Sequence, residues 1–191
     1  MYKRQELNRL KGECTETEIG TPKDDFTWAK HTLYSWLEVA CAKKEIEMCW
    51  LRIFYVYGPR QRPESLIPSI LTHLQNGELP ELRTPKNAND FVFVDDVARA
   101  FSNAISKLPP SAIYNIGSGF SIPVLEICRQ AEYILLGSDS LTCELEEKTH
   151  KSVCDVDFWA DCSNSKKSLG WVPTTNLNEG INKTREWLQI Q

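Results

Sequence analysis

Residues 48–56 read M-C-W-L-R-I-F-Y-V, a nearly continuous apolar run. Such a run is typical of a parallel β-strand that is covered on both faces. Apolar positions at helical spacing precede it and predict a long amphipathic helix over residues 25–44, with Asp24 or Asp25 as its cap. The apolar positions of this helix are Phe26, Ala29, Leu33, Trp36, Leu37 and Ala40.

The rest of the chain alternates between expected strands and helices, which indicates a single α/β domain. Residues 6–22 are expected to form a polar, irregular approach segment. Further strands are expected at residues 91–94, 114–116 and, after a polar loop, 141–146. Further helices are expected at residues 64–75, 95–106, 123–136, 163–169 and 177–190.

Composition excludes several classes of protein. A hydrophobic content of 41% in 191 residues is enough for a sizeable core. The net charge of -4 argues against a nucleic-acid partner, because such partners are held by phosphate neutralisation. The chain has no apolar run long enough to cross a membrane and no signal peptide pattern, so we expect a cytoplasmic location.

The sequence predicts no metal site. Its seven cysteines are an odd number without a C-x-x-C pair, which favours buried free thiols in a reducing compartment over metal ligands. The three histidines are far apart in the sequence and form no H-x-x-x-H pair.

Five short motifs follow one another along the chain. They are D-D-F-T-W-A-K (24–30), L-R-I-F-Y-V-Y-G-P-R-Q (51–61), N-D-F-V-F-V-D-D-V-A (89–98), Y-N-I-G-S-G (114–119) and K-K-S-L-G-W-V-P (166–173). In this order they resemble the extended short-chain dehydrogenase/reductases, which include the NAD-dependent sugar-nucleotide epimerases and dehydratases. The resemblance extends from about residue 6 to the C-terminus.

The resemblance implies the C-terminal part of a Rossmann-like doubly wound sheet, interleaved with a smaller α/β substrate-binding lobe over residues 6–191. The sequence lacks the opening strand, the G-x-x-G-x-x-G turn that holds the dinucleotide pyrophosphate and the acidic residue that binds its ribose. We therefore expect a C-terminal fragment of a protein that uses NAD or NADP. The residue that would distinguish these two cofactors belongs to the missing part.

Residues 1–5, M-Y-K-R-Q, are what translation of GTG-TAT-AAG-AGA-CAG gives when GTG is read as a start codon. This DNA is the end of a transposase adapter used in sequencing libraries. We interpret these residues as an artefact and leave them out of the fold. The alternative is a genuine basic N-terminus.

Phenylalanine stands where the family has the tyrosine of a Tyr-x-x-x-Lys motif. In such a motif the lysine ammonium stabilises a phenolate one helical turn away, so that the phenol can exchange a proton with a sugar hydroxyl. Lys30 fills the lysine position, which in the family also binds the nicotinamide ribose, but Phe26 cannot act as an acid or a base. The alternative is that Phe26 is an ordinary core residue and Lys30 a solvated helix lysine.

The resemblance also implies contacts for other residues. Phe54, Tyr55 and Val56 would lie beside the nicotinamide and the substrate, with Tyr55 in place of a common asparagine. The segment Ser65-Leu66-Ile67-Pro68 would lie near the nucleotide base, and Asn89 replaces an arginine that clamps the diphosphate. Arg60, Arg62 and Arg83 either supply this charge or are solvated surface residues.

The remaining acidic and apolar motifs have structural interpretations. We expect Asp95 and Asp96 to cap the following helix and organise the substrate lobe. The stretch L-G-W-V-P (169–173) resembles a packing motif of the family.

Three functions stay open for the parent protein. The first is an NAD(P)-dependent sugar-nucleotide epimerase, dehydratase or 4-ketoreductase, an oxidoreductase that dimerises through helix 25–44. The second is a non-catalytic relative that binds a sugar nucleotide or pairs with an active subunit, which Phe26, Tyr55 and Asn89 favour. The third is a binding domain without a cofactor. In all three, we expect no turnover by the 191 residues alone.

Overall fold

The structure is a computed structural model that describes residues 11–18, 22 and 24–189. The adapter-like residues 1–5 lie outside the described residues. The helices are α1 Asp25–Lys43, α2 Leu66–Gln75, α3 Val94–Lys107, α4 Val124–Leu136, α5 Ser140–Lys148, the π-helical turn η1 Ser165–Leu169 and α6 Leu177–Gln189. The strands are β1 Lys11–Cys14, β2 Cys49–Ile53, β3 Tyr55–Tyr57, β4 Ala88–Asn89, β5 Phe91–Phe93, β6 Ala112–Ile116, β7 Ile122–Pro123 and β8 Asp157–Ala160.

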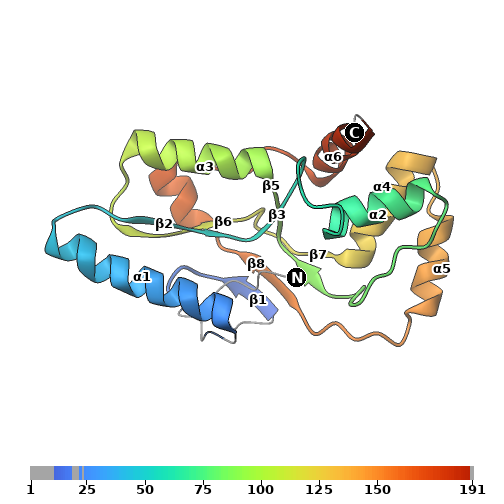
Figure 1. The fold of residues 1–191 in the computed structure, drawn as a ribbon, viewed down its shortest axis with the longest axis horizontal. Helices are drawn as coiled ribbons and strands as arrows, with labels where there is room; N and C mark the ends of the chain where they lie inside the picture. The colour runs from blue at the N-terminus through green and yellow to red at the C-terminus, as the bar shows by residue number, and fades with distance from the viewer. Residues whose placement is uncertain (1–10, 19–21, 23, 190–191) are drawn as a thin grey trace.

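The strands form three small sheets. β2 pairs with β6 and β3 with β5, both in parallel, while the largest sheet has the order β1-β8-β4-β7. In Figure 1, α1 and α3 lie on either side of the β2–β6 sheet, and α2, α4 and α5 gather at the other end of the molecule. The expected α/β class with parallel strands is confirmed.

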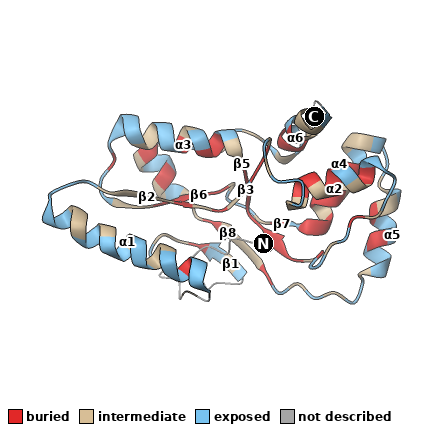
Figure 2. Ribbon diagram, viewed as in Figure 1, coloured by how far each residue is buried: buried red, intermediate tan, exposed pale blue. Residues whose placement is uncertain are grey.

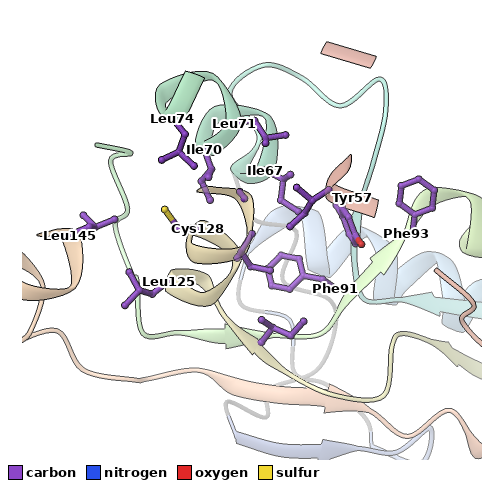
Figure 3. Packing of buried hydrophobic residues seen from close by; sticks show 14 residues of the cluster. Tyr57, Ile67, Ile70, Leu71, Leu74, Phe91, Phe93, Leu125, Cys128 and Leu145 are labelled. Carbon is purple, nitrogen blue, oxygen red and sulfur yellow. The ribbon is translucent and has the colours of Figure 1, made fainter. Parts of the chain in front are cut away.

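The main hydrophobic core lies at the end of the molecule where α2 and α4 meet the β3–β5 sheet (Figure 3). Its fully buried side chains include Ile67, Ile70, Leu71 and Leu74 from α2 and Ile127, Cys128 and Ala131 from α4. A second cluster packs α3 and η1 against β2 and β6. Figure 2 shows the same division, because buried residues concentrate in the centre and around α2 and α4 while α1 is mostly exposed.

The apolar run at residues 48–56 forms two short strands, whereas one continuous strand was expected. β2 ends at Ile53, and the Phe54 N–H still donates to the carbonyl of Ile116 at 2.9 Å. The next N–H, that of Tyr55, donates to the carbonyl of Asp90 at 2.9 Å, where β3 begins to follow β5. At Phe54 the apolar run therefore stops pairing with β6 and begins to pair with β5.

The prediction of a strand at residues 141–146 is wrong, because these residues belong to helix α5. The buried Glu132 carboxylate on α4 accepts hydrogen bonds from the backbone N–H groups of Leu141 and Thr142, at 2.9 and 2.7 Å. These are N–H groups of the first helical turn, which have no partner within their own helix. A side chain from another helix thus caps α5, and sequence spacing does not reveal this.

The approach segment expected at residues 6–22 contains a strand. β1 pairs in parallel with β8, with Lys11 opposite Asp157 and Cys14 opposite Ala160. Neither β1 nor β8 was expected, because both segments are only four residues long and β1 is polar. Pairing with distant strands, rather than local pattern, makes them extended.

Helix α1 forms as expected, but most of its predicted apolar stripe is exposed, and only Leu37 and Ala40 of that stripe are half-buried. Phe26, Leu33 and Trp36 are all exposed, Trp36 by 64%. Thr27 is buried, and the Tyr34 ring meets Trp50 of β2 edge-on, with 5.3 Å between ring centroids. Because α1 carries apolar side chains on both faces, the sequence pattern could not tell which face packs inward.

The L-G-W-V-P stretch is a packing motif, as expected. Leu169 and Trp171 are fully buried, and the indole N–H of Trp171 donates to the backbone carbonyl of Asp96 at 2.8 Å. The Asp96 carboxylate accepts the Thr174 hydroxyl at 2.9 Å and the Thr175 N–H at 3.0 Å. Asp96 thus fixes the segment before α6 instead of capping its own helix.

In the part of the chain that the structure describes, no helix is long and apolar enough to cross a membrane. The expected cytoplasmic location stays a prediction.

We expect Gly180→Ala to destabilise the protein, although alanine usually favours a helix by about 0.5–1 kcal/mol over glycine. A Cβ at Gly180 in α6 would lie 2.1 Å from the Tyr57 hydroxyl and 2.7 Å from two atoms of its buried ring. Such overpacking costs about 1–3 kcal/mol, which urea unfolding measures. Adding Tyr57→Phe should recover part of the loss, and Glu186→Ala on the same helix should change little. A Gly180→Ala protein as stable as wild type would contradict this packing.

Asp96→Asn should lower the free energy of unfolding at neutral pH by about 1.5–3 kcal/mol, the usual worth of hydrogen bonds to a charged group. Burial opposes ionisation of Asp96, but the hydrogen bonds from Thr174 and Thr175 and the Arg99 guanidinium at 2.7 Å hold its pKa below the ordinary value. The stabilisation is therefore present above the unfolded pKa, about 3.9, and is lost as pH falls through the lower folded pKa.

Unfolding of wild type and Asp96→Asn across acidic pH measures this difference in stability. The matched control is Asp95→Asn, because Asp95 is the exposed neighbour in the same helical turn. An equal loss of stability in both variants would contradict the assignment.

Candidate functional site

The first turns of α1 lie at the end of the β2–β6 sheet where both strands finish. α1 runs opposite in direction to β2, so its N-terminal end is beside the carboxyl ends of the strands (Figure 1). In open α/β sheets, ligands bind outside the carboxyl ends of the strands. Phe26 and Lys30, the expected catalytic pair, both belong to this part of α1.

Lys30 and Phe26 are in direct contact. The Lys30 ammonium lies 4.7 Å from the centroid of the Phe26 ring, one helical turn away, in a cation–π arrangement. A capping box sets the first turn, since the Thr27 N–H donates to the Asp24 carboxylate at 2.8 Å and the Asp24 N–H donates to the Thr27 hydroxyl at 3.2 Å. A phenyl ring has no ionisable proton, so the Phe26 side chain cannot transfer one within this contact.

The two nearest hydroxyls in the sequence are hydrogen-bonded to residues in α1 or at its N-cap. The buried Thr27 hydroxyl belongs to the capping box and donates to Asp24. The Tyr34 hydroxyl donates to the Glu38 carboxylate at 3.1 Å. Neither hydroxyl therefore replaces a phenol at Phe26.

Residues 54–56 differ in accessibility. The Phe54 side chain is 8% exposed and packs with Cys14, Ala160 and Phe158 in a small cluster. The Tyr55 ring is partly buried against Phe91, with 5.4 Å between ring centroids, and the Val56 side chain is exposed. Val56 and the open side of Tyr55 can reach a ligand, whereas the Phe54 ring lies within the protein.

Asn89 is buried on β4, which lies between β7 and β8. Its neighbour Asp90, which the sequence analysis did not single out, is fully buried and follows β4 directly. Burial raises the pKa of Asp90 above its ordinary value, although hydrogen bonds from Ala160, Ser118 and Gly119 oppose this effect. A lone acidic residue inside the apolar stretch N-D-F-V-F-V was the signal that could have identified it.

The expected base-binding segment lies at the start of α2. Ser65 is the residue before the helix, and its side chain makes no capping hydrogen bond. Ile67 is 1% exposed in the main core, and Leu66 packs partly against the same core. The side chain of Ser65 is therefore the most accessible polar group of the segment.

Arg60, Arg62 and Arg83 are all exposed, so the structure leaves both interpretations of these arginines open. Arg60 has a positive φ of 67°, and the following Gln61 amide donates to the Val56 carbonyl at 3.1 Å. The loop after β3 is thus tied back to the expected substrate strand.

A surface hollow of about 360 Å³ lies away from these residues, beside α4 and the loop that follows it. Its guanidinium group, that of Arg129, is already paired with Glu126 at 2.8 Å and Glu146 at 2.7 Å. The hollow contains none of the expected site residues, so we place the candidate site at the carboxyl ends of the strands.

The chain is similar to known proteins over most of its length. The sequence profile of the NAD dependent epimerase/dehydratase family matches residues 3–117. The dTDP-D-glucose 4,6-dehydratase of Bos taurus is 33% identical over 184 residues, which cover 93% of this chain and 51% of that enzyme. The chain thus spans about half the length of this relative.

Solved structures give the same result. The UDP-glucose 4-epimerase of Thermotoga maritima, solved with UDP-glucose, superposes with a TM-score of 0.78 at 28% identity over 93% of this chain and 57% of that one. MoeE5, solved with UDP-glucuronic acid and NAD, superposes with a TM-score of 0.74 at 26% identity over 94% of this chain and 60% of that one. The fold, the ordered motifs and the matching profile together show that this chain belongs to the NAD-dependent epimerase/dehydratase family.

Proposed function

We propose that these residues are part of an NAD(P)-dependent sugar-nucleotide epimerase, dehydratase or 4-ketoreductase. The observation that carries this proposal is the Phe26–Lys30 pair, 4.7 Å apart in the first turns of α1 at the carboxyl ends of β2 and β6. This is the end of an open α/β sheet where ligands bind. By their names, the relative from Bos taurus acts on dTDP-D-glucose and the one from Thermotoga maritima on UDP-glucose.

The residues present suit one part of a dinucleotide. An ammonium offers three hydrogen-bond donors, so Lys30 can hold the hydroxyls of the nicotinamide ribose. Val56 offers an exposed apolar surface for the face of the ring. A bound NAD or NADP supplies the hydride acceptor. The sequence has no G-x-x-G-x-x-G turn, so we assign no residue to the pyrophosphate.

The substrate is a sugar nucleotide in this proposal. Tyr55 and Asn89 would lie along it, because the Tyr55 N–H is bonded to the residue that directly follows Asn89. Ser65, with Leu66 and Ile67 behind it, would lie near the base. Tyr55 and Asn89 bring no positive charge, so the diphosphate needs Arg60, Arg62 or Arg83, or a residue outside the described part of the chain.

A non-catalytic relative that binds a sugar nucleotide is the second candidate. Phe26 has no hydroxyl, and the nearby hydroxyls of Thr27 and Tyr34 are bonded to Asp24 and Glu38. Within these residues of α1, no group takes the part of the proton carrier. Lys30 and Phe26 would then preserve the shape of a site without its chemistry.

Phe26→Tyr should raise the turnover of a sugar nucleotide, tested in the protein encoded by the longest reading frame that contains these residues. General acid–base catalysis is worth about 10²–10⁴-fold, so we expect a gain of at least about tenfold. Lys30→Ala should remove the gain, and Tyr34→Phe should leave it unchanged. NADH absorbance and 4-keto product formed from dTDP-glucose and UDP-glucose measure the rate. Substrate binding without turnover in either protein would favour the non-catalytic candidate, and an unaltered high rate would mean that another acid serves the site.

We also propose that the protein forms a homodimer through α1. Trp28, Leu33, Trp36 and Val39 are all exposed and share the face of α1 that points away from the sheet. Two tryptophans on one helix face are unusual on a free surface, because aromatic residues are enriched at the centres of interfaces. A second copy of the same helix would cover them.

Trp36→Glu should turn the dimer into a monomer, because a carboxylate would be buried opposite an apolar partner. Loss of a central aromatic residue typically costs at least about 2 kcal/mol, or roughly thirtyfold in the dissociation constant. Sedimentation velocity over a dilution series measures it. Ile105→Glu on α3 is the matched control, since Ile105 is also exposed and apolar but lies on the other side of the β2–β6 sheet. A dimer that survives Trp36→Glu would rule out this surface.

A further inference from the structure

Asp90 lies at the point where the chain passes from one sheet to another. It follows β4, which belongs to the four-stranded sheet, and precedes β5, which pairs with β3. Its backbone carbonyl accepts the N–H of Tyr55 at 2.9 Å. The two expected substrate residues, Tyr55 and Asn89, are therefore joined through the backbone of Asp90.

The Asp90 carboxylate binds two further elements. Its Oδ1 accepts the N–H and the hydroxyl of Ser118, the latter at 2.7 Å, in the turn after β6. Its Oδ2 accepts the N–H of Gly119 at 3.0 Å and the N–H of Ala160, at the end of β8, at 3.0 Å. Each oxygen thus has two donors, and three of the four are backbone N–H groups.

The space around this carboxylate is closed. A Cβ at Gly117 would lie 2.5 Å from Asp90 Oδ2 and 2.7 Å from the Ala160 side chain. The turn after β6 can approach Asp90 this closely only because Gly117 has no side chain. A side chain at position 117 would therefore displace the carboxylate or the turn that carries two of its donor residues.

From this arrangement we infer that Asp90 is a positioning residue of the substrate site. It holds Tyr55 and Asn89 in place against the turn after β6 and the end of β8. The inference rests on the proposed sugar-nucleotide site, because Tyr55 and Asn89 are its expected contacts. Asp90 itself does not touch the substrate in this account.

Asp90→Asn tests the inference directly. An asparagine keeps one acceptor oxygen and places a donating amide at the other position. In either orientation, at least one backbone N–H then faces a donor. Loss of such a bond to a buried charge should raise the dissociation constant of dTDP-glucose or UDP-glucose by at least about tenfold, measured by calorimetric titration of the protein encoded by the longest reading frame that contains these residues.

Two control variants separate positioning from general loss of stability. Asp96→Asn also removes a buried carboxylate but at a different junction, so it should destabilise the fold and change affinity by no more than about twofold. Ser118→Ala removes one donor and leaves three backbone N–H groups in place, so its effect on affinity should be similarly small. Wild-type affinity in Asp90→Asn, or an equal loss in Asp96→Asn, would overturn the inference.

A pH titration of the wild-type chain, followed by its amide proton resonances, tests the inference even if Asp90→Asn does not fold or neither sugar nucleotide binds. Failure of both sugar nucleotides to bind would count against the proposed function alone. The amide proton resonances of Ser118, Gly119, Ala160 and Tyr55 should shift with one common midpoint as pH falls. Among the described residues, Glu16, Asp157, Asp161 and the Cys14 and Cys162 thiols are titratable groups on the neighbouring elements, and Arg52 is the charged group on β2. A Tyr55 resonance that does not follow the other three would overturn the inference.

Discussion

A buried carboxylate at the junction of three sheets, that of Asp90, holds this architecture together. Its oxygens accept donors from the turn after β6 and from the end of β8, while its backbone carbonyl begins the pairing of β3 with β5. A buried charge without a cation is costly unless hydrogen bonds satisfy it. The four donors meet that condition, so the three sheets cannot move apart without exposing an unsatisfied charge.

The candidate site follows from this junction and from the capping of α1. The hydrogen bonds of Asp90 position Tyr55 and Asn89. The Asp24–Thr27 capping box fixes the start of the helix that carries Phe26 and Lys30. The Phe26 ring keeps the favourable contact with the Lys30 ammonium that an aromatic ring provides. A phenyl ring nevertheless has no ionisable proton. The residue at position 26 therefore keeps the contact with Lys30 but lacks the acid–base group, and both an enzyme and a non-catalytic relative are consistent with it.

Sequence pattern predicted the secondary structure correctly where residues within the segment itself mark the element and its ends. Helices α2 and α4 were predicted to within about two residues, since apolar spacing and a glycine end mark them. Where the secondary structure depends on contacts with distant residues, the element was not predicted or was predicted wrongly. Helix α5 is capped by Glu132 of α4, and β1 is extended because it pairs with β8, more than a hundred residues later.

The sequence by itself determined the family, the α/β class and the identity of the residue at the tyrosine position, because each depends on residue types in a fixed order. Only the tertiary structure decided which face of α1 turns outward, that the apolar run divides at Phe54, and that Asp90 is the shared partner of Tyr55, Ser118 and Ala160, which lie far apart in the sequence. Such facts depend on where hydrogen-bond donors from distant segments meet. A periodicity read along one segment contains no information about a donor that another segment supplies.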